Sequence, residues 1–432
     1  MTRYFILIVT TVIIVNHIFY ATTLKSKDIR NYLGTRTPYR YKYNKNDTKI
    51  KFPSCKDVKI WMVVRHGTRL PSVKDIVGMN TTLNDLKYEV LLKNKQGKGP
   101  LKEEDLKLFE KWKSDISVEE QKFLTFEGQD EMIQLAERMQ KRFPNAIKHK
   151  YNNKHFKFKY TATQRTQQSA RHFTLGLFDK NNSQNVIYEP ALKVDTTLRF
   201  YKHCDKWQKQ VKKNPNTYKE QVLYGNSHEM NLTLQSVSKR FGLDRVLSLD
   251  TVVLIYKICG YETSWHKYFP SPWCLGFDDV SIKTLEYYHD LKHYWLDGYG
   301  HDLTYQQACM ILKNMFESMT KNSPTATFLF AHSGTLLKLL THLNLYKPDS
   351  HLRGITKDEQ RPWRASDIDC FASNLAFVLF KCKDEEKILT LHQERIIKLP
   401  MCNEELCSFK HLKEFFNNSI NNCDHSEMCK ID

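Results

Sequence analysis

The sequence predicts an α/β fold, a three-layer sandwich of helices around a mainly parallel sheet, with a helical cap beside it. Short segments typical of strands occur at residues 61–64, 156–160 and 326–331. Each is followed by a loop and then by apolar residues at helical spacing. Strands that alternate with helices favour a parallel sheet covered on both faces. At 432 residues the chain exceeds one typical core, which favours a large domain with an insertion, or two domains.

The same patterns indicate five segments. We expect a signal peptide at 1–21, an N-terminal arm at 22–48, an α/β domain formed by 49–187 and 300–400, a helical cap at 188–299, and a cysteine-containing tail at 401–432. The arm is basic and rich in tyrosine, has little periodicity, and is expected to wrap the surface.

The most informative stretch is the loop after the first strand, Arg65-His66-Gly67-Thr68-Arg69-Leu70-Pro71. An unpaired charge beside a core is costly, so two arginines around a histidine make sense if an anion binds between them. Each guanidinium offers a planar fork of donors to phosphate oxygens. A neutral His66 imidazole between them could attack phosphorus. A solvated basic loop is the alternative, but the length and chemical coherence of the string favour a phosphate site.

A second anion site is indicated where the strand at 156–160 turns into a helix. Arg165 lies in the first turn of that predicted helix. Helix N-termini and guanidinium groups both favour negative charge. A surface arginine is the alternative for this segment taken alone. Arg171, further along the helix, is expected to face solvent or an acidic residue.

The string at 65–71 resembles the signature of the histidine acid phosphatases, in the branch that includes phytases and the multiple inositol polyphosphate phosphatases. The resemblance runs from about Thr37 to about Leu399, and the stretches Leu285–Gly300 and Phe371–Leu375 resemble that last group in particular. It implies a phosphoglycerate-mutase-like fold and a phosphohistidine formed on His66, with no metal and no cofactor. The residues that it implies as phosphate ligands are Arg65, Arg69, Arg165 and His332, the last also having a catalytic role.

The chain departs from this resemblance at the acid that protonates the leaving oxygen. Most branches have His-Asp after the third strand, and the inositol polyphosphate branch has His-Ala-Glu, whereas this chain has His332-Ser333-Gly334. Neither Ser333 nor Gly334 is a carboxylic acid, and losing a positioned acid typically costs about 10²–10⁴-fold in rate. One hypothesis is an enzyme that recruits another acid, either water or a carboxylate such as Asp369 or Glu127. The other is a phosphoester-binding homologue with little turnover. Gly334→Glu is expected to raise hydrolysis of alkyl phosphates.

Charge and composition support an anionic partner. Lys plus Arg at 66 against Asp plus Glu at 48 gives a net charge of +18, and a hydrophobic content of 41% is typical of a globular protein. Inositol polyphosphate is the partner that the resemblance implies, and anionic glycans are a further possibility. We expect no nucleic-acid partner, because no zinc-finger spacing, RNP-like string or helix-turn-helix pattern accompanies the charge.

The sequence also predicts secretion. Arg3, an apolar run interrupted at Asn16 and His17, and small residues from Ala21 are typical of a cleaved signal peptide, so no membrane association is expected after its removal. The 11 cysteines favour an oxidising compartment and leave at least one thiol unpaired. The pairs that spacing suggests are Cys259–Cys274, Cys402–Cys407 and Cys423–Cys429, with Cys55–Cys370 bridging two halves of the site. Glycosylation motifs occur at Asn46, Asn80, Asn181, Asn231 and Asn417.

Overall fold

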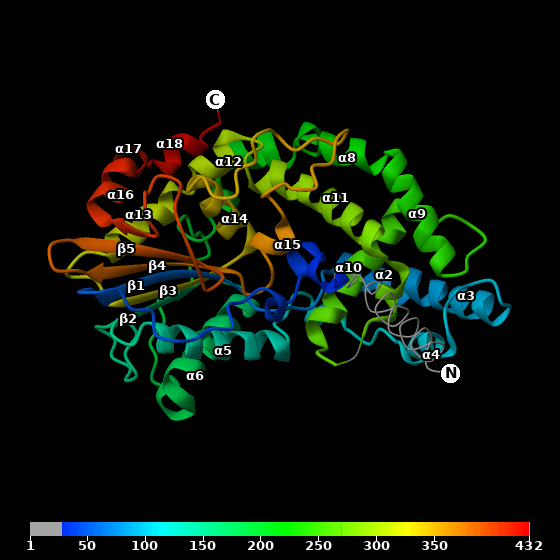
Figure 1. Cartoon of the computed structure of the whole chain (residues 1–432), viewed down its shortest axis with the longest axis horizontal. Helices are drawn as coiled ribbons and strands as arrows, with labels where there is room; N and C mark the ends of the chain where they lie inside the picture. Colours follow the sequence, from blue (N-terminus) through cyan, green and yellow to red (C-terminus); the bar gives the residue numbers. More distant parts are fainter. Residues whose placement is uncertain (1–27, 269, 432) are drawn as a thin grey trace, which may run out of the picture.

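The structure, a computed structural model, describes residues 28–268 and 270–431 (Figure 1). The predicted signal peptide at 1–21 therefore lies outside the described residues. In the described ranges, no helix combines the length and the apolar character needed to cross a membrane.

One mixed sheet forms the centre of the molecule, in the order β2-β3-β1-β4-β5-β6, with β7 also paired to β5. Its strands are β1 (Lys56–Arg65), β2 (Phe156–Tyr160), β3 (Ala326–Ala331), β4 (Asn374–Lys381), β5 (Glu386–His392), β6 (Arg395–Ile397) and β7 (Leu406–Ser408). Strands β2, β3 and β1 run parallel, whereas β4 is antiparallel to β1 and the remaining pairs are antiparallel. The predicted α/β fold class is confirmed. The parallel strands β1, β2 and β3 are those that precede the loops with the candidate phosphate ligands.

Helices cover both faces of the sheet. Alternate residues of β1 point to opposite faces, so β1 contributes side chains to a separate core on each face. Trp61 and Val63 belong to one core, together with residues of α13 (Cys309–Ser318) and α14 (Ser333–His342). Met62 and Val64 belong to the other, together with residues of α5 (Phe126–Arg142) and α6 (Gln164–Ser183). Figure 1 shows α5 and α6 on one side of the sheet and α13 and α14 on the other.

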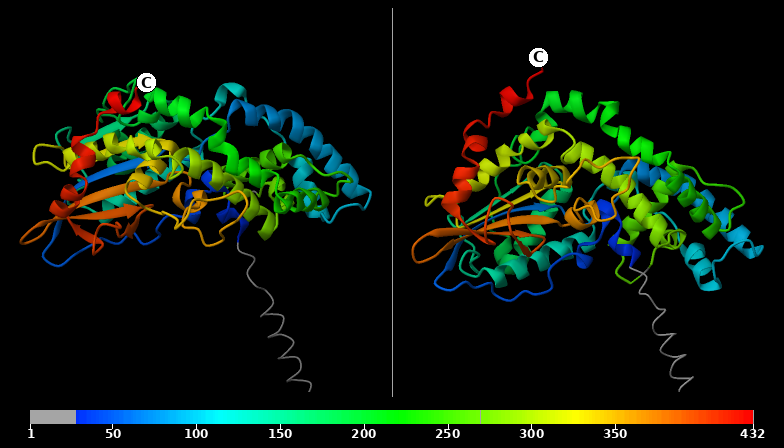
Figure 2. Two further views of the ribbon diagram at one scale, coloured as in Figure 1. Left: turned by 90° about the horizontal axis from the view of Figure 1, so that it is seen from above. Right: turned by 45° about the horizontal axis from the view of Figure 1, so that its top comes forward.

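A group of helices lies beside these layers, and it is drawn from two separate parts of the chain (Figures 1 and 2). They are α2 (Val73–Gly78), α3 (Asn84–Lys95), α4 (Glu103–Lys111), α8 (Lys219–Gly225), α9 (His228–Arg240), α10 (Leu249–Trp265) and α11 (Asp279–Asp297). The shorter helices are α7 (Asp205–Trp207), α12 (Asp302–Gln306), α15 (Ala365–Ile368), α16 (Phe409–Phe415), α17 (Asn417–Asn421) and α18 (His425–Cys429).

The N-terminal arm is more deeply placed than a surface-wrapping segment. Leu33, Thr37 and Tyr39 are buried. The 3₁₀ turn Gly34–Arg36 packs against α10 and α15. The apolar side chains in this short stretch are thus used to join the helical group to the sheet layers.

Five disulfides form within the described residues: Cys55–Cys382, Cys204–Cys429, Cys259–Cys274, Cys309–Cys423 and Cys402–Cys407. Two of the predicted pairs, Cys259–Cys274 and Cys402–Cys407, are therefore present. The predicted pairs Cys423–Cys429 and Cys55–Cys370 are wrong. Cys55 precedes β1, and because β4 is antiparallel to β1, the residue beside it is Cys382 at the end of β4. Cys370 is free and buried.

Candidate functional site

The residues predicted to bind phosphate come together at one edge of the sheet. In the parallel registers, Arg65 at the end of β1 pairs with Ala331 at the end of β3, and Tyr160 at the end of β2 pairs with Phe330. The loops that follow these three strands therefore leave the sheet side by side. Carboxyl ends of parallel strands are the usual place for a ligand site in α/β folds.

His66 is held as a buried, neutral imidazole. Its Nδ1 lies 2.9 Å from the carbonyl oxygen of Gly67. A carbonyl can only accept, so Nδ1 carries the proton and Nε2 keeps its lone pair. The pKa of His66 is well below its usual value because the ring is buried and because Arg165, Arg65 and Arg69 disfavour a further positive charge. An uncharged imidazole with a free Nε2 is the form that can act as a nucleophile.

His332 lies against both His66 and Arg165. The ring centroids of the two histidines are 5.7 Å apart, and Nη2 of Arg165 donates to Nδ1 of His332 at 3.3 Å. Because arginine only donates, Nε2 of His332 carries the proton, and it lies 2.8 Å from Oγ1 of Thr161. The pKa of His332 is well below its usual value, through burial and then the charges of Arg165 and Arg199. The structure therefore brings together His66 from the loop after β1, Arg165 from the first turn of α6 and His332 at the N-cap of α14.

The arginines around these rings form a cluster with few acids. Arg65 forms an ion pair with Asp369 at 3.5 Å and also donates to the carbonyl of Asp369. Arg69 donates to the carbonyl of Leu70 at 2.7 Å, and neither it nor Arg165 pairs with a carboxylate in the described ranges. Burial, and then Arg69 and Arg199, lower the pKa of Arg165 to about 10. The buried Nε atoms of Arg65 and Arg165 have no hydrogen-bond partner. Such a cluster of donors is suited to an anion.

Two cations near this cluster were not predicted from the sequence. Lys202 lies in the 3₁₀ turn Phe200–His203, and Arg199 is the residue before that turn. The charges of both residues lower the pKa of His332. Burial, and then Lys212 and Arg199, lower the pKa of Lys202 to about 8. Sequence reasoning assigned this segment to the helical cap, and no local motif distinguishes these two residues from other basic residues there.

The first two turns of α5 fix the shape of the loop at 65–71. The backbone N–H of Thr68 donates to Glu131 at 2.7 Å, and the Thr68 hydroxyl donates to the other carboxylate oxygen at 2.9 Å. Burial raises the pKa of Glu131 to about 7. A Cβ on Gly67 would lie 2.4 Å from the carbonyl oxygen of Gly128, so the two backbones approach too closely for a side chain.

The space around Gly334, one of the two positions where the resemblance implies a proton donor, is filled. A Cβ on Gly334 would lie 3.1 Å from Cζ of Tyr201 and 3.4 Å from a carboxylate oxygen of Asp297. Asp297 pairs with the buried Lys338 at 2.5 Å, and its pKa is well below the usual value although burial opposes this. A glutamate introduced by Gly334→Glu would thus press on Tyr201 and lie beside an ionised carboxylate. That substitution alone does not restore an open acid site.

The two carboxylates considered as substitutes differ sharply. Glu127 pairs with Arg40 at 3.3 Å and with Lys267 at 3.0 Å, so both of its partners lie away from the turn at 332–334. Asp369 is fully buried and accepts a hydrogen bond from the Ser333 hydroxyl. Burial raises the pKa of Asp369 to about 6, with Arg65 opposing the rise. Only Asp369 contacts a residue of the 332–334 turn.

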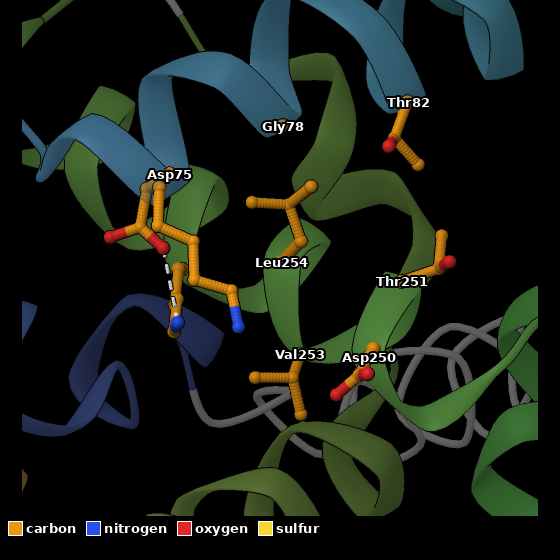
Figure 3. A pocket seen from close by; sticks show the side chains of 9 residues that line it. Asp75, Gly78, Thr82, Asp250, Thr251, Val253 and Leu254 are labelled. Atoms are coloured by element: carbon orange, nitrogen blue, oxygen red, sulfur yellow. Dashed lines mark hydrogen bonds and ion pairs between the residues drawn. The ribbon is translucent and has the colours of Figure 1, made fainter.

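A pocket of about 200 Å³ between α2 and α10 has a different character (Figure 3). Lys257 forms an ion pair there with Asp75 at 3.0 Å, and Asp250 adds a second carboxylate to the lining. Val253 and Leu254 supply apolar side chains. Because two carboxylates line this pocket, it differs in charge from the arginine cluster at the strand ends, where acids are few.

Comparison with known proteins agrees with this geometry. The pattern that defines the histidine phosphatase superfamily (branch 2) matches residues 59–399, so the chain belongs to that family. The chain is similar to multiple inositol polyphosphate phosphatase 1 of Drosophila melanogaster, with 31% identity over 386 residues, or 85% of this chain and 80% of the relative. The human protein of the same name is 25% identical over 96% of this chain and 89% of its own. The resemblance to this branch predicted from the sequence is confirmed.

Solved structures show the same fold. The phytase from D. castellii superposes with a TM-score of 0.72 at 16% identity and covers 94% of this chain and 90% of its own. A Bifidobacterium longum multiple inositol polyphosphate phosphatase, in complex with inositol hexasulfate, gives a TM-score of 0.61 at 13% identity and covers 86% of this chain and 94% of its own.

Proposed function

We propose that this protein is a secreted phosphomonoesterase that acts on inositol polyphosphates through a phosphohistidine intermediate. The observation that carries the proposal is a buried, uncharged His66 with a free Nε2, surrounded by three arginines of which only Arg65 pairs with a carboxylate among the described residues. The names of its relatives, multiple inositol polyphosphate phosphatases and a phytase, support the substrate class.

The chemistry follows from this arrangement. Arg65, Arg69 and Arg165 would hold the phosphoryl group and neutralise the charge on its oxygens in the transition state, where positioning and electrostatics supply most of the catalysis. His332 would contact the same group, with Arg165 held against its ring. Nε2 of His66 attacks phosphorus, a P–N bond forms, and the P–O bond to the leaving group breaks. Water then attacks the phosphohistidine and releases inorganic phosphate.

The proposal is tested by phosphate release from inositol hexakisphosphate and from p-nitrophenyl phosphate, measured side by side. Both should be hydrolysed, and His66→Ala should lower both rates by about 10³-fold or more. His411→Ala, on the surface helix α16, is the matched control and should leave both rates unchanged. Retention of hydrolysis by His66→Ala would exclude the phosphohistidine mechanism.

A second candidate function rests on the residues at 333–334. Because Tyr201 and Asp297 occupy the place of the usual acid, the protein would bind phosphoesters and turn them over only slowly. Calorimetry would then show tight binding of inositol hexakisphosphate with slow release from p-nitrophenyl phosphate and almost none from the inositol ester. A general binder of anionic glycans would instead lose affinity steeply with salt and be indifferent to His66→Ala.

Secretion and glycosylation are part of the proposal. The five asparagines of the glycosylation motifs are all exposed, and ten cysteines are paired in disulfides. Both features are typical of exported proteins.

A further inference from the structure

Asp369 is a buried carboxyl group that links the turn at 332–334 to the arginine cluster. It directly follows α15, and its side chain is fully buried. Its Oδ2 accepts a hydrogen bond from the Ser333 hydroxyl and lies 3.5 Å from Nη1 of Arg65. Its Oδ1 has no hydrogen-bond partner in the described part of the chain. One carboxyl group therefore contacts both an expected phosphate ligand and the residue next to His332.

The charged groups that face Asp369 come from two elements, β1 and α11. Arg65 on β1 favours its anion, while from α11 His293 also favours the anion and Asp297 favours the proton. Asp297 is itself paired with His293 at 3.0 Å and with Lys338. Burial outweighs the opposing charges, and the pKa of Asp369 reaches about 6. Of the two carboxyl groups beside the turn, Asp297 is thus the fixed anion and Asp369 is the group that can carry a proton.

We propose that Ser333 protonates the leaving oxygen and that Asp369 resupplies its proton. This inference rests on the proposed function, because it assigns a proton donor to that reaction. When Asp369 is protonated, its carboxyl donates to Oγ of Ser333, which reverses the hydrogen bond described above and leaves the Ser333 hydroxyl proton free to point to the leaving oxygen. As the P–O bond breaks, the Ser333 hydroxyl gives its proton to the leaving oxygen, and the protonated Asp369 carboxyl gives its own to Oγ of Ser333. The products are a neutral alcohol, the phosphohistidine and an Asp369 carboxylate. In the second step the attacking water returns a proton along the same path, and the P–N bond breaks.

Substrate binding would favour the protonated form of Asp369. Arg65 is the cation that pairs with Asp369, at 3.5 Å. A bound phosphate dianion beside Arg65 offsets that cation, so the carboxyl group loses part of the interaction that favours its anion. The proton would therefore be present when the leaving group needs it. In this arrangement Ser333 is the catalytic residue and Asp369 acts through it as a positioning and proton-supplying residue.

The test compares leaving groups in the full-length protein. An alkoxide leaving group needs a proton and a nitrophenolate hardly needs one, so the two substrates separate loss of the acid from general damage. Asp369→Asn is expected to lower kcat/KM for inositol hexakisphosphate by about 10²–10⁴-fold and that for p-nitrophenyl phosphate by less than about tenfold. Ser333→Ala should show the same separation, which would place the two residues on one proton path.

Glu262→Gln is the matched control. Glu262 is also buried, also accepts a serine hydroxyl, from Ser271, and also has its pKa raised by burial, to about 7. It should leave the ratio of the two kcat/KM values unchanged. Equal losses on both substrates, or no loss in Asp369→Asn or Ser333→Ala, would overturn the proton path while leaving the phosphatase assignment intact. A wild-type protein that hydrolyses neither ester would overturn the proposed function itself. Thermal midpoints of all variants identify any loss caused by unfolding.

Discussion

Arg165, a proposed phosphate ligand, is expected to lower the stability of the folded protein. It is half-buried among other cations, and its pKa falls to about 10 because of burial and the charges of Arg69 and Arg199. The folded protein therefore disfavours the charged form of Arg165. At neutral pH the guanidinium is charged, so it lowers the free energy of unfolding unless an anion is bound. Arg165→Gln is expected to raise the thermal midpoint by about 1–3 °C and to lower kcat/KM for phosphate esters by about 10²–10³-fold.

Calorimetry and a phosphate-release assay check this pair of changes. Arg171→Gln is the matched control, since Arg171 lies on the same helix but is exposed. It should change neither the midpoint nor the rate appreciably. A lower thermal midpoint in Arg165→Gln would mean that the guanidinium stabilises the fold. It would contradict the interpretation of the cluster as an anion site in which like charges destabilise the folded protein.

Local sequence was sufficient to find some site residues and insufficient for others. Arg65 and His66 stand in a string whose chemistry is interpretable by itself, because two cations and an imidazole follow a buried strand. Arg199 and Lys202 stand in a lysine-rich region where most basic residues are solvated. Only the long-range packing of their 3₁₀ turn against α14, which begins directly after His332, brings them near His332. Asp369 was one of two possible acids, and the Ser333 contact that distinguishes it depends on a separation of 36 residues.

The contact between α5 and the loop at 65–71 leaves no room for side chains. A Cβ on Gly128 would lie 2.2 Å from the carbonyl oxygen of Thr68, a backbone atom that cannot move without moving the loop. Gly128→Ala is expected to cost about 1–3 kcal/mol of stability and about 10²-fold or more in kcat, because a displaced loop misplaces His66. Gln129→Ala, the next residue of α5, should leave kcat unchanged. Full activity in Gly128→Ala would show that the loop tolerates a shift.

The elements themselves were largely predictable, and their directions were not. The alternating or continuous apolar patterns at 156–160 and 326–331 correspond to β2 and β3. Between residues 386 and 397 the chain forms two strands, because β5 ends at His392 and β6 begins at Arg395. Gln393 and Glu394 have φ angles of 49° and 66°, which turn the chain back on itself. Apolar periodicity reports burial and carries no information on strand direction, so the antiparallel placement of β4 was not predicted.

The C-terminal tail, of which the sequence indicates only that it contains cysteines, connects distant parts of the molecule. Disulfides join Cys423 to Cys309 in α13 and Cys429 to Cys204. In addition, Nε2 of His425 in α18 lies 3.0 Å from the carbonyl oxygen of Phe200. Spacing alone favoured a local Cys423–Cys429 pair, because pairings across 114 and 225 residues depend on the folded topology. The tail therefore supports the segment that carries Arg199 and Lys202.

Removing the Cys204–Cys429 disulfide should consequently affect both stability and substrate selection. The paired variant Cys204→Ser/Cys429→Ser is expected to lose about 2–5 kcal/mol of stability, because the bond closes a long loop in the unfolded chain. Its KM for inositol hexakisphosphate should rise more than its KM for p-nitrophenyl phosphate, since a loosened 3₁₀ turn withdraws cations that only a polyphosphorylated substrate would use. Cys402→Ser/Cys407→Ser removes a disulfide with a sequence separation of only 5, so it should lower the thermal midpoint less and leave both KM values unchanged. An equal rise in both KM values for the Cys204→Ser/Cys429→Ser variant would contradict a specific role of this segment in binding the further phosphates.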